Sequence, residues 1–239
     1  MVEKERVLNH SAALRYYDRF GKKQDSQGFY EDPAIDELIT HSSLQDARSV
    51  FEFGCGTGKF ASRILENHLP SSASYLGCDI SPVMVGLAKK RLEPHGERAK
   101  VILSDGAVQF PVSDHSVDRV ISNYVLDLLS KEDIQRFFSE SHRAASIRDG
   151  IVCLASLTRG VTLSSRIVSS LWMTIFRMRP SVVGGCRPIC LESYVDFGQW
   201  QLKHQRVLTP FGVPSEVIIL ISRSTPNKAN AVDARSSRD

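Results

Sequence analysis

The stretch "SVFEFGCGTGKF", residues 49 to 60, joins a hydrophobic run to three glycines at alternate positions. The run stops at Gly54, and Gly56 and Gly58 follow it, with the acid Glu52 just before them. Glycine has no Cβ atom, so a turn this rich in glycine allows the backbone to approach a ligand closely. We therefore expect a buried strand that ends in a ligand-binding turn.

Strand-like and helix-like segments alternate around this stretch. Strands are expected at 49–54, 73–80, 100–106, 117–126 and 150–157, and helices at 33–44 (opened by Pro33), 58–69, 82–92 and 131–145. This rhythm predicts an α/β fold, a Rossmann-like doubly wound sheet that is mostly parallel, with helices on both faces. Two more strands, at 200–210 and 215–223, follow a helical insertion. They bring the sheet to seven strands, and the last strand is expected to be antiparallel.

Composition is that of an ordinary soluble globular protein, with 239 residues, 42% of them hydrophobic and 24% charged. The formal net charge is +3, and the basic residues are scattered. Charge therefore gives no reason to expect a nucleic-acid partner. The first ten residues lack the apolar segment of a secretory signal, and three of the five cysteines lie in apolar runs. Free thiols in a reducing, cytoplasmic setting are expected.

The spacing of the glycines argues against a phosphate-binding turn. A dinucleotide turn of the form G-x-G-x-x-G that starts at Gly54 needs glycine at position 59, where the chain has Lys59. A P-loop needs Ser or Thr at position 60, where the chain has Phe60. Both phosphate interpretations fail on spacing.

The observed pattern E-x-G-x-G-x-G resembles motif I of the class I S-adenosylmethionine-dependent methyltransferases. Three further motifs agree in order: "LGCDIS" ends the second strand, "SDG" the third and "SNYVL" the fourth. The nearest style is the small-molecule group of quinone-biosynthesis methyltransferases. The resemblance implies S-adenosyl-L-methionine as the cofactor, with the glycine turn under its methionine part.

Cofactor contacts follow from the resemblance, motif by motif. Asp79 corresponds to the acid that binds both ribose hydroxyls, and a carboxylate can accept from two adjacent hydroxyls. Asp105 corresponds to the acceptor for the adenine amino group. A tyrosine of the N-terminal segment is expected to touch the methionine carboxylate. The expected cofactor-binding residues are Tyr17, Glu52, Gly54, Cys55, Gly56, Gly58, Asp79, Ile80, Asp105, Gly106 and Asn123.

The predicted organisation is a single methyltransferase domain over residues 1–223. Its parts are a helical lead-in or lid (1–44), a cofactor-binding core (45–157), a substrate-lid insertion (158–199) and a terminal strand pair (200–223). The tail, 224–239, is polar and expected to be disordered.

The predicted reaction is in-line displacement of the methyl group onto a small, apolar or aromatic acceptor. The sequence does not identify a catalytic residue. Tyr124 and Asp127 are candidates because they follow the fourth strand; the alternatives are a packed aromatic and a first-turn acid facing water.

The insertion offers further substrate contacts. Residues 161–178 carry an apolar stripe with two arginines, too polar for a bilayer-spanning helix. The stripe predicts an amphipathic lid helix, or a pocket wall including Trp172 that could open at a membrane surface. Arg179 and Arg187 could hold an anionic substrate group or be solvated surface residues.

Alternatives remain at this stage. The acceptor could be a protein or peptide, or the chain could be a non-catalytic cofactor-binding subunit. No metal is expected, because Cys186 and Cys190 form a C-x₃-C pair without a second pair or a nearby histidine. The oligomeric state is left open.

Overall fold

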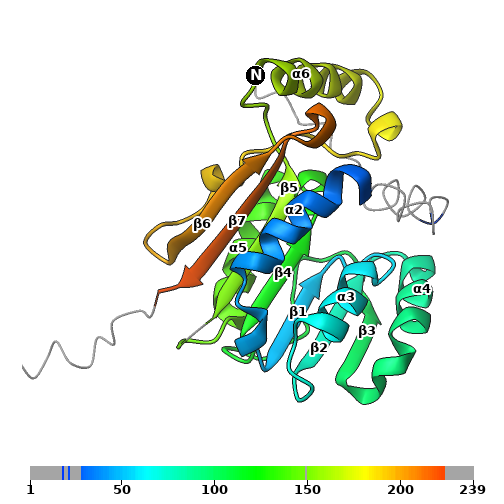
Figure 1. Cartoon of the computed structure of the whole chain (residues 1–239), viewed down its shortest axis with the longest axis vertical. Coiled ribbons are helices and arrows are strands. Elements are labelled where there is room, and N and C mark those ends of the chain that lie inside the picture. The colour runs from blue at the N-terminus through cyan, green and yellow to red at the C-terminus, as the bar shows by residue number, and fades with distance from the viewer. Residues whose placement is uncertain (1–17, 19–20, 22–27, 149, 224–239) are drawn as a thin grey trace, which may run out of the picture.

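A seven-stranded sheet runs through the molecule in the order β3-β2-β1-β4-β5-β7-β6 (Figure 1). The computed structural model describes residues 18, 21, 28–148 and 150–223. Parallel pairing joins β1 to β2 and β4, β2 to β3, and β4 to β5. β7 is antiparallel to both β5 and β6, which confirms the predicted mixed sheet with a reversed last strand. The strands are β1 (Ser49–Phe53), β2 (Ser74–Asp79), β3 (Ala99–Leu103), β4 (Arg119–Asn123), β5 (Ile151–Leu157), β6 (Trp200–Leu208) and β7 (Ser215–Ser222).

Helices cover both faces of the sheet. The α-helices are α2 (Gly28–His41), α3 (Lys59–Asn67), α4 (Pro82–Leu92), α5 (Lys131–Ala144) and α6 (Leu163–Met178). Apolar side chains of α2, α3 and α4 share one core with the sheet, and α5 shares the other core with its opposite face. Short 3₁₀ turns connect the elements, among them η4 (Leu126–Leu128), η5 (Pro180–Val183) and η7 (Pro210–Gly212).

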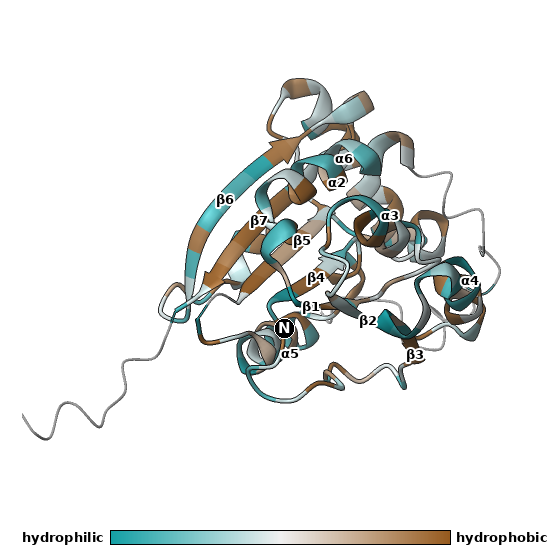
Figure 2. Cartoon of the chain, turned by 60° about the horizontal axis from the view of Figure 1, so that its bottom comes forward, coloured by the Kyte–Doolittle hydropathy of each residue, from teal (hydrophilic) through white to brown (hydrophobic). Residues whose placement is uncertain are grey.

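The hydrophobic central strands explain why both faces must be covered. Every residue of β5 is buried, and β1, β4 and β7 are buried over most of their length. Figure 2 shows β4, β5 and β7 largely in brown, the hydrophobic end of its scale. A strand buried on both faces is typical of a parallel sheet between helix layers.

Helix α2 starts earlier than the sequence suggests. It begins at Gly28, so Pro33 lies inside it rather than in its first turn. A proline inside a helix costs one backbone hydrogen bond. Burial of Tyr30 on the first turn, together with Ala34, Ile35 and Leu38 beyond the proline, offsets that cost.

The insertion between β5 and β6 contains α6, which confirms the predicted helical insertion. Thr162 caps it: the Thr162 Oγ1 accepts from the Ser165 N–H at 3.2 Å, and the Ser165 Oγ accepts from the Thr162 N–H at 2.9 Å. Figure 1 places α6 at one end of the molecule, away from α3 and α4. None of the helices in the described part of the chain combines the length and apolarity that a bilayer crossing requires.

Candidate active site

The turn after β1 requires its glycines. Gly54, Gly56 and Gly58 have φ angles of 79°, 52° and 73°, in the left-handed region that favours glycine. The N–H groups of Gly54 and Cys55 both donate to the Cys78 carbonyl at 2.9 Å, which fixes the turn on the end of β2. The predicted glycine turn therefore forms at the carboxyl end of β1.

Two of these glycines also lie so close to neighbours that a side chain would displace them. A Cβ atom on Gly54 would lie 2.4 Å from Val125 Cγ2, and one on Gly58 would lie 3.1 Å from Ala88 Cβ. Alanine at position 54 would thus displace the segment after β4, and at position 58 it would push α3 away from α4.

Asp79 lies at the end of β2, next to the glycine turn. Its Oδ2 accepts from the Gly56 N–H and its Oδ1 from the Ser81 N–H, both at 2.9 Å. Ser81 Oγ donates in turn to Asp18 of the N-terminal segment at 2.6 Å. Burial raises the pKa of Asp79 above its ordinary value. Each carboxylate oxygen retains a lone pair that could accept from a ligand hydroxyl.

Glu52 is buried in β1 beneath the turn. Its Oε2 accepts a 2.5 Å hydrogen bond from the Tyr75 hydroxyl, and its Oε1 accepts from the Asn123 amide nitrogen at 3.5 Å. Burial raises the pKa of Glu52 to about 7, against the lowering effect of these two donors. The other amide atom, Asn123 Oδ1, is buried and accepts no hydrogen bond.

A cavity opens where the glycine turn, the end of β4 and α2 meet. Six of the predicted site residues line it: Glu52, Gly54, Cys55, Gly56, Asn123 and Tyr124. Seven others that line it were not predicted: Glu31, Asp32, Ile35, Thr57, Lys59, Phe60 and Arg63. Three of these seven come from α2, and the signal that could have found them is an acidic, amphipathic helix placed just before the first strand.

Glu31 is the most notable of the residues that sequence reasoning missed. Burial raises the pKa of its carboxyl to about 7; a hydrogen bond with Tyr30 and the charge of Lys59 act in the lowering direction. The charges of Asp127 and Asp32 act with burial. A carboxyl group that lines a cavity and titrates near neutrality can exchange a proton there.

Tyr124 has a left-handed backbone, with φ 55°, and its hydroxyl donates to the Ser215 Oγ at 2.9 Å. Its ring packs edge-on against Tyr30, with 6.0 Å between the ring centroids. Burial raises the pKa of Tyr124 well above its ordinary value. The phenol therefore stays neutral at physiological pH, a state suited to hydrogen bonding rather than to taking up a proton.

Asp127 and Arg187 are both buried, and neither lines the cavity. The Asp127 carbonyl accepts from the Arg187 N–H and from Nη1, each at 3.1 Å, and Oδ2 accepts from the Leu157 N–H at 3.3 Å. Burial raises the pKa of Asp127 to about 7, while the Leu157 N–H and the charge of Arg187 lower it. The pair holds the insertion against the end of β4. Because both side chains are buried, the interpretations of Asp127 as an acid facing water and of Arg187 as a solvated surface residue were wrong.

The remaining predicted residues lie elsewhere. Trp172 on α6 donates from Nε1 to the Cys186 carbonyl at 3.0 Å, and Arg179 is exposed at the end of that helix. Asp105 is exposed after β3, where its Oδ1 accepts from the Ala107 N–H at 2.9 Å. Gly106 has φ 91°, and Ile80 is half-buried after Asp79. Tyr17 lies outside the described residues.

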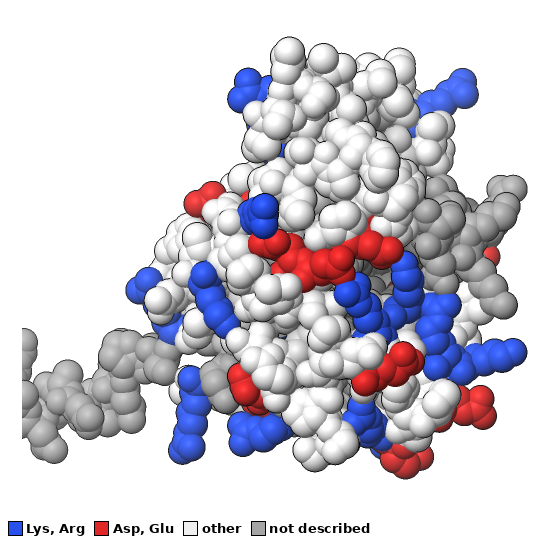
Figure 3. Space-filling view, viewed as in Figure 1, with Lys and Arg blue, Asp and Glu red and all other residues white. Residues whose placement is uncertain are grey.

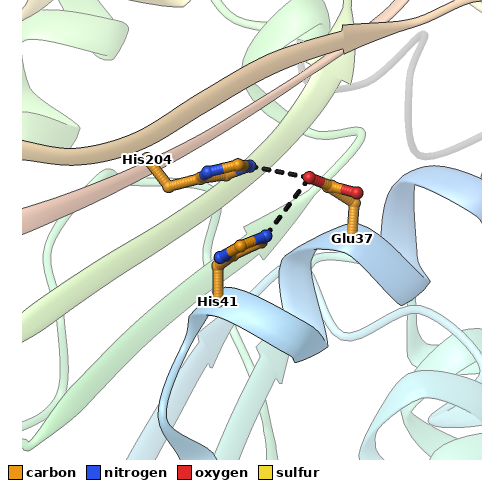
Figure 4. A group of neighbouring side chains, drawn as sticks. All are labelled: Glu37, His41 and His204. Carbon is orange, nitrogen blue, oxygen red and sulfur yellow. Dashed lines mark hydrogen bonds and ion pairs between the residues drawn. The ribbon is translucent and has the colours of Figure 1, made fainter.

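One group of possible metal ligands lies apart from the cavity (Figure 4). Glu37 Oε1 is 2.8 Å from His204 Nε2 and 3.3 Å from His41 Nε2. The two imidazoles are stacked, with 3.6 Å between centroids and 11° between planes, so their in-plane lone pairs run side by side instead of converging on one ion. Arg206 is 3.0 Å from the other oxygen of Glu37. As arranged, the group joins α2 to β6 by hydrogen bonds.

Charged side chains border the cavity in two groups. Helix α2 carries four acids, Glu31, Asp32, Asp36 and Glu37, and Figure 3 shows an acidic band across the middle of the molecule, with basic side chains below it. Lys59 is 3.0 Å from Asp32, and Arg63 is 2.5 Å from Asp36. These ion pairs join α2 to α3 across the cavity rim.

Comparison with known proteins identifies the domain around this cavity. Residues 50–146 match the family model described as "Methyltransferase domain". The chain carries a class I, S-adenosylmethionine-dependent methyltransferase domain. The matched range contains the glycine turn and the ends of β1 to β4, and S-adenosylmethionine is the cofactor of this class of domain.

Curated relatives of this methyltransferase domain differ in substrate. The chain is 24% identical over 152 residues to the tRNA N(3)-methylcytidine methyltransferase Mettl2 of Drosophila melanogaster, covering 59% of this chain and 46% of that protein. It is 34% identical over 93 residues to malonyl-[acyl-carrier protein] O-methyltransferase 1 of Ilyobacter polytropus, covering 38% of this chain and 32% of that protein. The chain thus matches less than half the length of these relatives.

A solved structure gives the fold of the methyltransferase domain over most of the chain. The cyclopropane synthase MmaA2 from Mycobacterium tuberculosis superposes with a TM-score of 0.67 and 15% identity, covering 92% of this chain and all of that one. At this identity the likeness establishes the fold and not the substrate.

The residues around the cavity fit S-adenosylmethionine in chemical type. Asn123 Oδ1 is an unpartnered buried acceptor, and the Glu52 carboxyl lies beside it, so both suit the cofactor's ammonium group. Lys59 and Arg63 line the same cavity and suit a carboxylate. Asp79 would hold the ribose hydroxyls, and the positive-φ glycines allow the backbone to come close to the ligand.

Proposed function

We propose that this chain is an S-adenosylmethionine-dependent methyltransferase that moves a methyl group by in-line displacement to a small, apolar or aromatic acceptor. The observation that carries the proposal is one cavity bounded by the glycine turn, Glu52 and Asn123, with Asp79 hydrogen-bonded to the same turn. When bound, the cofactor supplies a methyl group already activated on a sulfonium.

The chain's own residues then have three tasks: to bind, to orient and to exclude water. Glu52, Asn123 and Asp79 hold and orient the cofactor, with Asp105 at its adenine end. Tyr30 and Tyr124 place apolar ring surface beside the cavity, and ordering of the reactants can supply several kcal/mol of the barrier reduction. The cavity need not be polar, because methyl transfer converts the positively charged sulfonium into a neutral thioether.

Glu31 is the best-placed general base for an acceptor that must lose a proton. It lines the cavity, and its pKa of about 7 lets it be ionised while remaining basic enough to accept a proton. Tyr124, with its raised pKa, would act as a hydrogen-bonding wall of the acceptor site. Asp127 and Arg187 would act through the insertion that they hold in place.

A tRNA acceptor is the second candidate, because the Drosophila relative carries that activity in its name. The acidic helix α2 beside the cavity argues for the small acceptor, since nucleic-acid binding depends on basic side chains that meet the phosphates. A protein or peptide acceptor, and a non-catalytic cofactor-binding role, are tested by the same experiment.

The test is transfer of labelled methyl from S-adenosylmethionine to three separate fractions: a small-molecule extract, total tRNA and protein. Label in the small-molecule fraction that depends on Glu52 and Asp79 supports the proposal. Label confined to tRNA or to protein overturns the proposed acceptor class. Cofactor binding without transfer to any fraction favours the non-catalytic role, and absence of binding overturns the methyltransferase proposal.

A further inference from the structure

The outer side of α6 is apolar and exposed. Leu163, Ile167, Leu171 and Met178, which we name the α6 face, have relative exposures of 78%, 62%, 60% and 69%. Their spacing of four, four and seven residues places them along one side of a helix. Such a stripe normally faces a core, and an exposed apolar stripe of this length points to an interaction surface.

The inner side of α6 is packed against the rest of the protein. The orientation of the helix about its own axis is therefore fixed, and the α6 face is the side that is left exposed. Ser165, Ser169 and Phe176 are buried on that side. Ser165 belongs to the capping box with Thr162, and the Ser169 Oγ accepts from the Gly160 N–H at 3.1 Å. These hydrogen bonds satisfy the buried serines, and rotating the helix would break them.

The charge around the α6 face has one sign. Residues 158–191 contain five arginines and no Asp, Glu or Lys. Arg166 and Arg177 are eleven residues apart, about three turns, so they lie along one edge of the stripe. Arg159 and Arg179 lie just outside the two ends of the helix, and all four of these arginines are exposed. Figure 3 shows this end of the molecule as a white surface with basic side chains at its edges and no acidic ones in view.

Neighbouring turns extend the apolar surface at the same end of the molecule. Phe211 in η7 is 81% exposed, and Val182 in η5 is 62% exposed. Turn η7 packs against α6, since a Cβ atom on Gly212 would lie 3.2 Å from Val168 Cγ2. Because α6 forms one end of the molecule (Figure 1), a flat surface could meet the α6 face without obstruction by the sheet.

We propose that the α6 face docks the protein on an anionic phospholipid surface, with its aliphatic side chains in the boundary between headgroups and acyl chains and its arginines at the phosphates. An interfacial helix combines an apolar side with basic residues in this way. A second copy of the chain is a poorer occupant, because a two-fold contact through this face would bring arginines of both copies together. This docking is independent of methyl transfer.

The test is flotation of the purified full chain with vesicles of phosphatidylcholine alone and of phosphatidylcholine mixed with phosphatidylglycerol. We expect binding to the mixed vesicles that weakens with added salt, and little binding to phosphatidylcholine alone. The triple variant Leu163→Ser, Ile167→Ser, Leu171→Ser should lower the partition coefficient by about a hundredfold. The pair Arg166→Gln, Arg177→Gln should lower it by about twenty-five-fold, about fivefold for each arginine.

Matched controls use exposed residues away from α6. Val83→Ser with Leu103→Ser tests loss of exposed apolar surface, and Lys89→Gln with Lys90→Gln tests loss of charge. Both pairs should bind vesicles as the wild type does, and circular dichroism checks that every variant is folded. Three results would overturn the proposal: no binding of the wild type at low salt, equal binding to both vesicle types, or a concentration-dependent dimer that the triple variant abolishes.

Discussion

The backbone N–H of Gly56 donates a 2.9 Å hydrogen bond to Oδ2 of Asp79, which ties the turn after β1 to the end of β2. One carboxylate thus holds the shape of the turn, and it is the group expected to bind the ribose hydroxyls. Asp79→Ala should lower the affinity for S-adenosylmethionine by about tenfold to a hundredfold, because hydrogen bonds to a charged group are worth about 1.5–3 kcal/mol. Isothermal titration calorimetry measures the loss.

The same substitution leaves the N–H groups of Gly56 and Ser81 without their acceptor, so some loss of stability is expected as well. Asp79→Asn keeps the size of the side chain but offers one acceptor oxygen to these two N–H groups, so a loss of stability is expected for it as well. Glu132→Ala, an exposed acid on α5, is the control and should bind as the wild type does. Unchanged affinity in folded Asp79→Ala would remove Asp79 from the site.

Glu52 predicts a pH dependence of cofactor binding. Its pKa is raised to about 7 by burial, so below that pH the free protein holds a neutral carboxyl beneath the turn. A cationic amino group prefers the ionised form, and binding must therefore expel a proton at lower pH. Affinity for S-adenosylmethionine should rise about fivefold from about pH 6 to about pH 7 and then level off. Calorimetry in buffers of different ionisation enthalpy also reports the released proton.

Glu52→Gln serves as the control, because its amide oxygen can still accept from Tyr75. It should bind the cofactor more weakly and without the pH slope. In the folded protein the pKa of the Glu52 carboxyl is about 7, whereas its ordinary pKa is 4.5. Protonation of Glu52 therefore favours the folded state. This contribution to stability is fully present below about pH 4.5 and is lost as the pH rises through about 7. The melting temperature of the wild type should therefore fall relative to that of Glu52→Gln between about pH 4.5 and about pH 7. If the two melting temperatures depend on pH in the same way, the pKa of Glu52 is not raised.

The glycine turn could be predicted from the sequence because its determinants are local. Left-handed φ angles at Gly54, Gly56 and Gly58 are a property of glycine itself, and Lys59 and Phe60 exclude phosphate turns by spacing alone. The alternation of strand-like and helix-like segments is also a local pattern, and it predicts a mostly parallel sheet.

The acidic wall of the cavity could not be predicted from sequence, since it depends on where α2 packs. Glu31 lies 21 positions before Glu52 in the sequence, and only the docking of α2 on β5 and β7 brings it to the same cavity. Likewise, Asp127 and Arg187 are 60 residues apart, and no periodicity reveals that the arginine donates to the aspartate carbonyl. Long-range pairing of polar groups leaves no pattern in a single sequence.

Arg187 should be a stability determinant. Its side chain is buried against Asp127, whose pKa its charge lowers, so Arg187→Met leaves a buried carboxylate without that charge. We expect a loss of about 3 kcal/mol in the free energy of unfolding at about pH 8. The loss should be smaller at about pH 5.5, where Asp127 is protonated. Urea unfolding at both pH values measures the difference.

Arg179→Met is the matched control for that prediction. Arg179 is exposed in the same insertion, and its replacement should change the free energy of unfolding by no more than about 0.5 kcal/mol. Equal effects of the two substitutions would contradict the proposed anchoring of the insertion through Arg187.

Glu31 predicts the pH profile of the transfer step. A general base must be ionised, and burial raises the pKa of Glu31 to about 7. At saturating cofactor, the rate of labelled methyl transfer should therefore rise with pH up to about 7 and stay constant above it. Glu31→Gln should lower the rate by about a hundredfold or more and remove this rise.

Asp32→Asn is the control, because Asp32 lines the same cavity but is exposed and paired with Lys59. It should keep the rise with pH, with the midpoint moved toward lower pH because the charge of Asp32 raises the pKa of Glu31. A wild-type profile in Glu31→Gln would instead mean that the acceptor needs no base or that another group supplies it.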